Sequence, residues 1–145
     1  MLENTAYTLS ATMFELLAHP RDLQKVKNEL ATAIPDKDRV PSYSEVENLP
    51  YFNACIQEVL RLHPGVLSRM PRVSPEVDIV YNDKRRGTTY VIPPGTSTSM
   101  STYITHTNPD VFEDPYEYRP QRWIDNPKLS RSFIAFSRGS RNCVG

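Results

Sequence analysis

The sequence predicts a mainly α-helical chain with a small β component. Apolar residues recur at helical spacing in most of the segments before residue 64. Two runs rich in β-branched residues and tyrosine, 77–81 and 88–92, have the composition of short strands. Most of the thirteen prolines lie after residue 64, which predicts turns and irregular loops in the second half of the chain.

Two helices are expected at the start of the chain. Residues 4–17 predict the first, which ends at His19-Pro20 because the residue before a proline avoids the helical conformation. Residues 21–33 predict the second, since apolar residues follow one face of it: Leu23, Val26, Leu30 and Ala33.

A short third helix is expected after residue 41. Ser42-x-x-Glu45 and Ser44-x-x-Glu47 both have the spacing of a capping box. In that arrangement the serine and glutamate side chains each bond the other residue's backbone N–H group. Either serine therefore suits the start of this helix.

A fourth helix is expected to begin at Pro50, because proline suits the first helical position. It ends before His63-Pro64 for the same reason as the first helix. Glu58 and Arg61, three residues apart, share one of its faces. Taken alone, such a pair is commonly solvated and contributes roughly 0.2–0.5 kcal/mol.

The two expected strands are joined by the turn-rich residues 82–87, and the Pro-Pro-Gly sequence at 93–95 ends the second strand. Residues 96–103 predict a further β segment. Residues 104–135 show little periodicity, so no regular structure is expected there.

Charge and composition exclude several classes of function. Lys plus Arg and Asp plus Glu both number 17, so the net charge is zero and no basic stripe predicts nucleic-acid binding. There is no run of about eighteen apolar residues and no signal peptide at the start. The two cysteines do not make a disulfide framework, and Cys55 is expected to be a small buried apolar residue.

Residues 136–145 carry the most informative pattern, Phe-Ser-Arg-Gly-Ser-Arg-Asn-Cys-Val-Gly. Cys143 lies between glycines, which permit sharp turns and a close approach of the backbone to a ligand. Nearby arginines and exposed N–H groups favour a deprotonated thiolate. The alternative is a glycine-rich loop whose cysteine is merely reactive or inert.

This loop resembles the haem-binding loop of the cytochrome P-450 family. Five positions carry the resemblance: Phe136, Gly139, Arg141, Cys143 and Gly145. The resemblance implies that these residues bind haem b (iron protoporphyrin IX), with the Cys143 thiolate as the axial ligand of the iron. It also implies the family's fold, of which this chain is the C-terminal-side portion, from the end of the I helix to the cysteine loop.

Two further segments resemble motifs of that family. Residues 58–61 match its Glu-x-x-Arg motif, and residues 118–123 match its Pro-x-Arg-Phe/Trp segment, with Gln121 where glutamate is common. The resemblance implies a buried charged cluster, in which a costly carboxylate is paired with planar guanidinium groups. Its members are Glu58, Arg61 and Arg122. The alternative for Arg122 is a surface arginine beside a tryptophan.

The resemblance also implies a reaction. A thiolate-ligated haem favours cleavage of the O–O bond, and the expected activity is insertion of one oxygen atom into an apolar small molecule. Arg72 and Arg141 match positions that bind haem propionates through charge-assisted bonds, although Arg72 also suits a surface position at a strand end. Val66, Leu67 and Met70 match a segment that faces the substrate in the family. The alternative is that these three side chains pack in the core.

One departure from the family pattern lies at the start of the chain. The family's I helix has an acid followed directly by a threonine that handles protons for bound oxygen. Here Glu3 matches the acid, Asn4 follows it, and Thr5 comes one residue late. A shift of one residue turns a helical side chain by about 100°, so Thr5 does not replace the missing hydroxyl. Asn4 keeps the ability to hold a water, because its amide both donates and accepts.

The resemblance covers nearly the whole chain but only a stretch of the family's domain. It predicts one partial domain over residues 1–145, truncated at both ends. For the full-length protein it implies a flavoprotein reductase as partner and attachment to the endoplasmic reticulum membrane through an N-terminal anchor absent here. A finer resemblance is to enzymes of fungal secondary metabolism of the trichodiene-oxygenase type. Two alternatives stay open: a haem-thiolate isomerase or dehydratase, and an inactive truncated chain that cannot hold haem.

Overall fold

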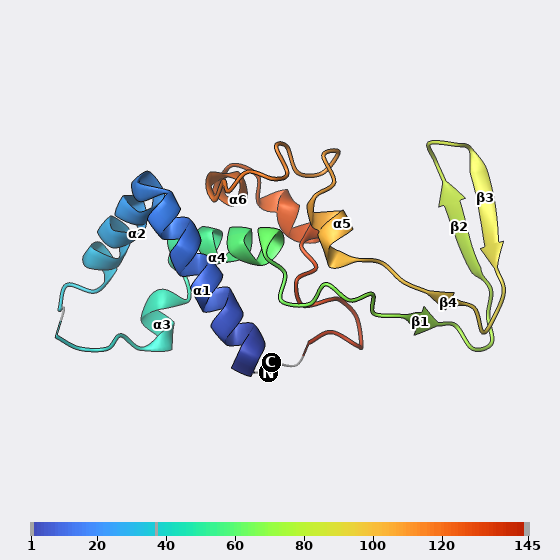
Figure 1. Cartoon of the computed structure of the whole chain (residues 1–145), viewed down its shortest axis with the longest axis horizontal. Coiled ribbons are helices and arrows are strands. Elements are labelled where there is room, and N and C mark those ends of the chain that lie inside the picture. Colours follow the sequence, from blue (N-terminus) through green and yellow to red (C-terminus); the bar gives the residue numbers. More distant parts are fainter. Residues whose placement is uncertain (1, 37, 144–145) are drawn as a thin grey trace. The chain divides into compact units, whose positions relative to one another are not determined.

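The computed structural model describes residues 2–36 and 38–143 (Figure 1). Contacts divide the chain into two compact units. The helical unit comprises the residues up to Leu67 and those from Thr102 onward, and the strand unit comprises Ser68–Ser101. Helices dominate and the β-sheets are small, as the sequence predicted.

The four helices expected in the first part of the chain are present. They are α1 (Leu2–Ala18), α2 (Pro20–Ala33), α3 (Tyr43–Val46) and α4 (Pro50–Leu62). His19 separates the first two: its backbone N–H donates to the carbonyl of Glu15 at 2.9 Å, and Pro20 follows as the first residue of α2.

Helix α3 selects one of the two capping boxes. Ser42 is its N-cap, and the backbone N–H of Ser42 donates to Oε2 of Glu45 at 2.9 Å. The box that begins at Ser44 is not used, because Ser44 already lies inside the helix. Glu45 also forms an ion pair with Arg39, which fixes the carboxylate beside Ser42.

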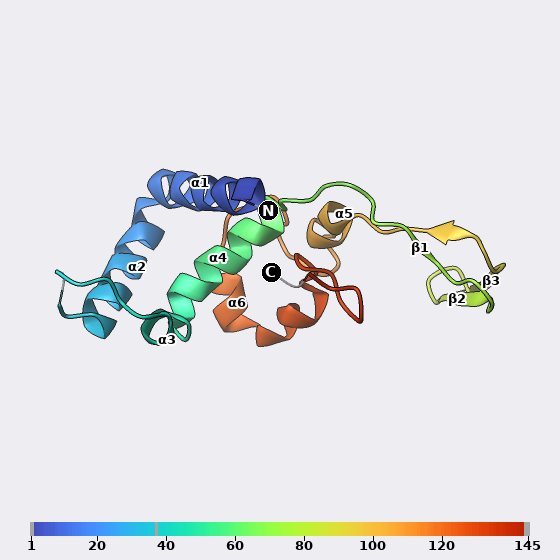
Figure 2. The ribbon, with the colours of Figure 1, turned by 90° about the horizontal axis from the view of Figure 1, so that it is seen from below.

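Helix α4 is the centre of the helical unit, because two apolar clusters meet on it. Figure 2 shows α4 with α1 and α2 to one side and α6 to the other. The first cluster joins α1, α2 and α4 and contains Leu16, Val26, Tyr51 and Cys55. The second joins α4 to the later part of the chain and contains Ala54, Phe112, Trp123 and Leu129.

The later part of the chain has more helix than the sequence predicted. Helices α5 (Thr102–His106) and α6 (Gln121–Asp125) and a 3-10 helix (Pro127–Ser132) lie where little or no regular structure was expected. Each is too short to show a periodic signal, and packing stabilises such segments more than propensity does. Trp123 and Leu129 provide this packing by entering the second cluster.

The strand unit contains two antiparallel pairs. Strand β1 (Arg72–Val73) pairs with β4 (Ser97–Thr98), and β2 (Ile79–Asp83) pairs with β3 (Thr88–Ile92). The predicted hairpin is therefore present, although β2 is shifted by two residues from 77–81. The β segment expected over 96–103 shrinks to β4, because α5 begins at Thr102.

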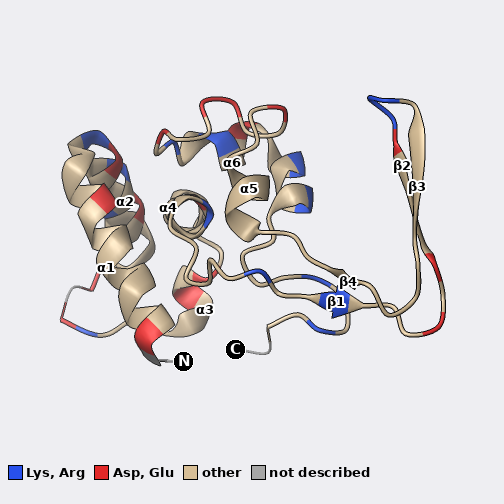
Figure 3. Ribbon diagram, turned by 45° about the vertical axis from the view of Figure 1, so that its right-hand side comes forward, with Lys and Arg blue, Asp and Glu red and all other residues tan. Residues whose placement is uncertain are grey.

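The tip of the β2–β3 hairpin is basic, with Lys84, Arg85 and Arg86 drawn blue in Figure 3. The carboxylate of Asp83 accepts the backbone N–H groups of Arg85 and Arg86 at 3.0 and 3.2 Å. Gly87 completes the turn with a positive φ of 62°, a conformation that glycine adopts without steric cost.

None of the helices that the structure describes combines the length and the apolar character needed to cross a membrane.

Candidate functional site

Glu58, near the C-terminal end of α4, is fully buried and accepts five hydrogen bonds. Its Oε1 accepts from Nη2 of Arg61 at 2.8 Å, Nε of Arg122 at 3.0 Å and the backbone N–H of Arg119 at 3.0 Å. Its Oε2 accepts from Nε of Arg61 and Nε1 of Trp123, both at 2.9 Å. A buried carboxylate is costly unless it is paired and hydrogen-bonded, and here both conditions are met.

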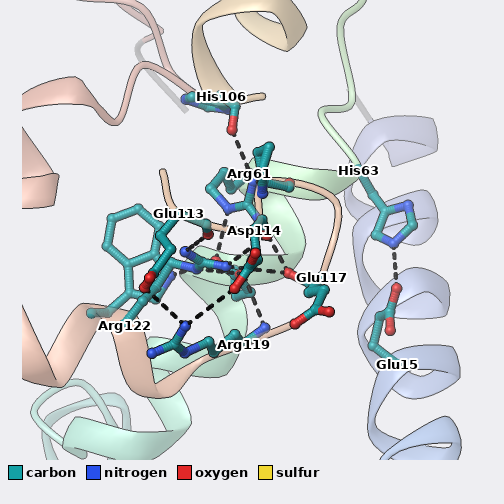
Figure 4. A network of polar contacts seen from close by, with 12 residues as sticks. Glu15, Arg61, His63, His106, Glu113, Asp114, Glu117, Arg119 and Arg122 are labelled. Carbon is teal, nitrogen blue, oxygen red and sulfur yellow. Dashed lines mark hydrogen bonds and ion pairs between the residues drawn. The ribbon is translucent and has the colours of Figure 1, made fainter. Parts of the chain in front are cut away.

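Arg61 uses every N–H group of its guanidinium. Besides its two bonds to Glu58, it donates from Nη1 to the carbonyls of His106 at 2.8 Å and Pro115 at 2.6 Å, and from Nη2 to that of Glu117 at 3.1 Å. A guanidinium has five donors in one plane. The side chain therefore ties α4 to the end of α5 and to two points of the irregular segment that follows it (Figure 4).

Arg122, in α6, completes this charged cluster. Its terminal nitrogens donate to the carbonyls of Glu113, Asp114 and Glu117. The carbonyl oxygen of Glu117 thus accepts from both arginines, and backbone dipoles balance the positive charge that Glu58 alone does not neutralise. The structure brings together the three residues that the sequence grouped: Glu58, Arg61 and Arg122.

Trp123 and the backbone of Arg119 are members of the cluster that the sequence analysis missed. The indole N–H of Trp123 is a buried donor that needs an acceptor, and Trp123 directly follows Arg122 in the motif. That adjacency was an available signal. No simple pattern reveals the N–H of Arg119, because it reaches Glu58 through the course of the loop. The side chains of Glu58, Arg61, Arg122 and Trp123 are buried and bonded to one another, so the cluster supports the structure of the helical unit.

A second polar contact joins α1 to the end of α4. Oε1 of Glu15, a buried carboxylate, lies 2.6 Å from Nε2 of His63 (Figure 4). Oε2 of Glu15 lies 3.4 Å from Nδ1 of His19. No sequence pattern predicts a role for Glu15, and in the sequence the two histidines mark only positions where helices end.

Cys143 has a free and exposed thiol on a tightly turned loop. Its backbone N–H donates to the carbonyl of Phe136 at 2.8 Å, and within this closure the N–H of Asn142 donates to that of Gly139 at 3.1 Å. Ser137 and Gly139 have positive φ values of 63° and 80°. The loop therefore presents the thiol outward, and a glycine occupies one of the two positions where the backbone is left-handed.

The two cysteines differ in the chemistry open to them. Cys55 is 1% exposed, and burial raises the pKa of its thiol to about 11. Cys55 therefore stays protonated at neutral pH and is a small buried apolar residue, as the sequence predicted. It is a poor metal ligand, because only a thiolate binds a metal well. Cys143 is exposed and free, so its sulfur is accessible to a metal.

Other loop residues implied by the resemblance lie at the surface. Arg141 is exposed and Phe136 is 53% exposed, so both side chains are open to a bound group. Gly145 lies outside the described residues. Arg72 belongs to the strand unit, where its guanidinium donates to the carbonyls of Met70 at 3.3 Å and Pro71 at 3.0 Å.

The candidate catalytic residues occupy the first turn of α1. Glu3, Asn4 and Thr5 are all exposed. The side chain of Asn4 lies against Gly65, where an added Cβ would be 3.6 Å from Cβ of Asn4. The helical unit thus places Asn4 beside the start of the segment expected to face substrate. The side chains of Val66, Leu67 and Met70 are exposed among the described residues, and both expectations for them, a substrate-facing segment and ordinary core packing, stay predictions.

Comparison with known proteins decides the family. The sequence matches the family described as cytochrome P-450 over residues 2–145. The chain belongs to the cytochrome P-450 family. Proteins of the cytochrome P-450 family use haem as their cofactor. The family resemblance read from the cysteine loop and the two charged motifs is therefore confirmed.

Curated cytochromes P-450 of fungi are similar to this chain. Fusicoccadiene C-8 hydroxylase of Phomopsis amygdali is 40% identical over 144 residues, which are 97% of this chain and 26% of that protein. Monooxygenase astB of Talaromyces wortmannii is 39% identical over 143 residues, 97% of this chain and 29% of that protein. Monooxygenase TRI4 of Trichoderma arundinaceum is 40% identical over 147 residues, with coverage of 99% and 27%. The chain spans about a quarter of the length of these relatives.

Proposed function

We propose that this chain supplies the thiolate ligand and its structural support in a haem-dependent monooxygenase. The observation that carries the proposal is the free, exposed Cys143 on a closed loop. The fungal cytochrome P-450 relatives, which include a named hydroxylase, support the same reaction class.

The residues of the chain divide the work of holding the cofactor. Cys143 would provide the thiolate that holds the iron, and Phe136 and Gly139 shape the loop around it. Gly145, which lies outside the described residues, keeps the haem-binding role that the family resemblance implies. Arg141 would provide positive charge for a haem propionate, through a bond of the charge-assisted kind, and the same role for Arg72 stays a prediction from the family resemblance. When bound, haem supplies the activation of molecular oxygen, and the protein supplies orientation and electrostatics.

The residues at the start of α1 handle water and protons in this proposal. Asn4 orients a water beside Gly65 through its amide, and Glu3 provides a carboxylate in the same turn of α1, while Thr5 is turned by about 100° from Asn4. The substrate is an apolar small molecule, because exposed apolar side chains follow Gly65. Secondary metabolism is the setting that the fusicoccadiene hydroxylase supports.

The complete gene product takes its electrons from a flavoprotein reductase at the endoplasmic reticulum membrane in this proposal. Asn4, which replaces the family's threonine, favours a second candidate function: isomerisation or dehydration without external electrons. The two are separated by measuring whether turnover of an apolar substrate consumes oxygen and needs the reductase. The monooxygenase requires both, and the isomerase or dehydratase requires neither.

The ligand assignment is tested with alanine variants of the complete gene product that contains residues 1–145. Cys143→Ala should abolish the thiolate-type absorption of the reduced carbon monoxide complex, because no sulfur is left to bind the iron. Cys55→Ala is the matched control and should keep that spectrum, since the Cys55 thiol is buried in the first apolar cluster. The reverse pattern would show that Cys143 is not the ligand.

A further inference from the structure

His106, the last residue of α5, is fully buried and makes two separate polar contacts. Its backbone carbonyl accepts a hydrogen bond from Nη1 of Arg61 at 2.8 Å. Its ring nitrogen Nε2 accepts the backbone N–H of Ile134 at 3.0 Å. One residue therefore contacts the charged cluster through its backbone and the segment before the cysteine loop through its ring.

The ring of His106 is held in place by aromatic neighbours. It stacks on Phe133, with 5.5 Å between ring centroids and 8° between planes, and meets the edge of Phe112 at 6.1 Å. An imidazole nitrogen that accepts a hydrogen bond carries no proton, so the ring is neutral and its proton lies on Nδ1. Among the described residues Nδ1 has no partner, so the bond to Ile134 is the single polar contact of the ring.

Ile134 lies two residues before the cysteine loop, which comprises residues 136–145. Its carbonyl accepts the N–H of Ser137 at 2.9 Å, and the carbonyl of Phe136 accepts the N–H of Cys143 at 2.8 Å. The N–H of Ile134 is thus bound by a side chain of the core, and the two residues that follow lead into the turn that carries the thiol. A continuous series of bonds runs from Glu58 through Arg61 and His106 to Ile134.

We infer that His106 is a positioning residue that fixes the cysteine loop to the buried charged cluster through the bond from its ring to Ile134. The last step of this inference, from loop position to iron ligation, rests on the proposed function. The bond itself does not. The packing on Phe133 orients the ring, and the ring then determines where the backbone of residue 134 lies.

A matched pair of amides tests the inference in the complete gene product. In His106→Gln the amide oxygen reaches the place of Nε2, whereas in His106→Asn the shorter side chain reaches only the place of Nδ1. Hydrogen exchange is followed at the Ile134 amide. His106→Asn should speed this exchange roughly fivefold, since a lost hydrogen bond costs about 1 kcal/mol. His106→Gln should keep most of the protection.

Phe112→Leu is the control for general damage to the core, because Phe112 touches the same ring but makes no bond to Ile134. It should speed exchange across the helical unit without singling out Ile134. Equal protection of Ile134 in the asparagine variant and the unchanged protein would overturn the inference. An equal loss in the asparagine and glutamine variants would also overturn it.

The same variants report on the cofactor separately. His106→Asn should lower the fraction of haem with a thiolate-type carbon monoxide spectrum, and His106→Gln should restore it. If His106→Asn changes exchange at Ile134 but leaves the spectrum unchanged, the link from loop to iron is wrong. If Cys143→Ala keeps the spectrum, the proposed function fails, while the exchange result still decides the role of His106.

Discussion

Arg61 presents five N–H groups in one plane, and each of them has an acceptor. Two groups are paired with a carboxylate and three with backbone carbonyls. Lysine could not replace this arrangement, because a compact ammonium lacks the planar fork. The residue is thus suited to organising an irregular segment whose own backbone makes few regular bonds.

Arg61→Ala should destabilise the protein by about 3–5 kcal/mol, since it leaves Glu58 as a buried charge that has lost a partner. The urea midpoint of unfolding measures this loss. Arg119→Ala is the control: among the described residues its exposed side chain pairs with Glu113 and Asp114, and its backbone N–H to Glu58 is kept. Such surface pairs contribute about 0–1 kcal/mol. Similar losses in the two variants would contradict the buried role of Arg61.

Burial lowers the pKa of His106 from 6.5 to about 4. Between these values the unfolded chain binds more protons than the folded one, so the free energy of unfolding should fall as pH drops from about 6.5 to about 4. The complete loss would be roughly 3 kcal/mol. Unfolding followed from pH 6.5 to 5 in the unchanged protein and in His106→Gln isolates this contribution. Identical slopes would show that His106 does not titrate in this way.

At the scale of single elements, α4 lacks a capping side chain of its own. The residue before Pro50 is Leu49, which has no polar group. The carboxylate of Glu29 in α2 takes this role, since it accepts the N–H groups of Tyr51 at 2.9 Å and Phe52 at 2.7 Å. A negative charge is also favourable at the N-terminus of a helix. The helix that carries Glu58 is therefore capped by its neighbour.

Glu29→Ala should lower the free energy of unfolding by about 1–2 kcal/mol, because it removes the group that caps the N-terminus of α4. Thermal unfolding measures the change, and hydrogen exchange should increase first at Tyr51 and Phe52. Lys27→Ala changes an exposed residue of the same helix and is the control for an altered helix propensity of α2. It should leave the unfolding temperature nearly unchanged. An unchanged unfolding temperature in Glu29→Ala would show that the cap is unimportant.

At the scale of the whole molecule, α1 has an apolar face that the described residues leave uncovered. Four of its side chains are more than half exposed: Leu9, Met13, Phe14 and Leu17. Three of these follow one another at intervals of four, which places them on one side of the helix. Exposed apolar patches of this kind promote association.

Residues 1–145 expressed alone should therefore self-associate and hold no haem. Gel filtration with added haemin, followed by the carbon monoxide spectrum, tests both parts. A matched variant with Leu9→Lys and Leu17→Lys should be less associated, if the α1 face is responsible, and should still lack haem. A monomer with one thiolate-ligated haem per chain would overturn this prediction.

The order of the helices in the first part of the chain and the β2–β3 hairpin followed from local signals. His19-Pro20 marks the end of the first helix, Pro50 marks the start of the fourth, and β-branched composition with turn residues marks the strands, because these signals depend on backbone sterics and nearest neighbours. The cysteine loop and the two charged motifs were readable for the same reason: each is a short continuous run of residues. The grouping of Glu58, Arg61 and Arg122 came from the family resemblance and agrees with the structure.

Tertiary structure alone decided the rest. The caps and bonds that matter most join residues far apart in sequence: Glu29 to Tyr51, Trp123 to Glu58, and Ile134 to His106. A carboxylate, an indole or an imidazole has no local pattern that names its distant partner, because the partner is chosen by packing. The short helices formed for that reason too: Trp123 of α6 enters the second apolar cluster, and His106 of α5 packs on Phe112 and Phe133, where propensity is weak.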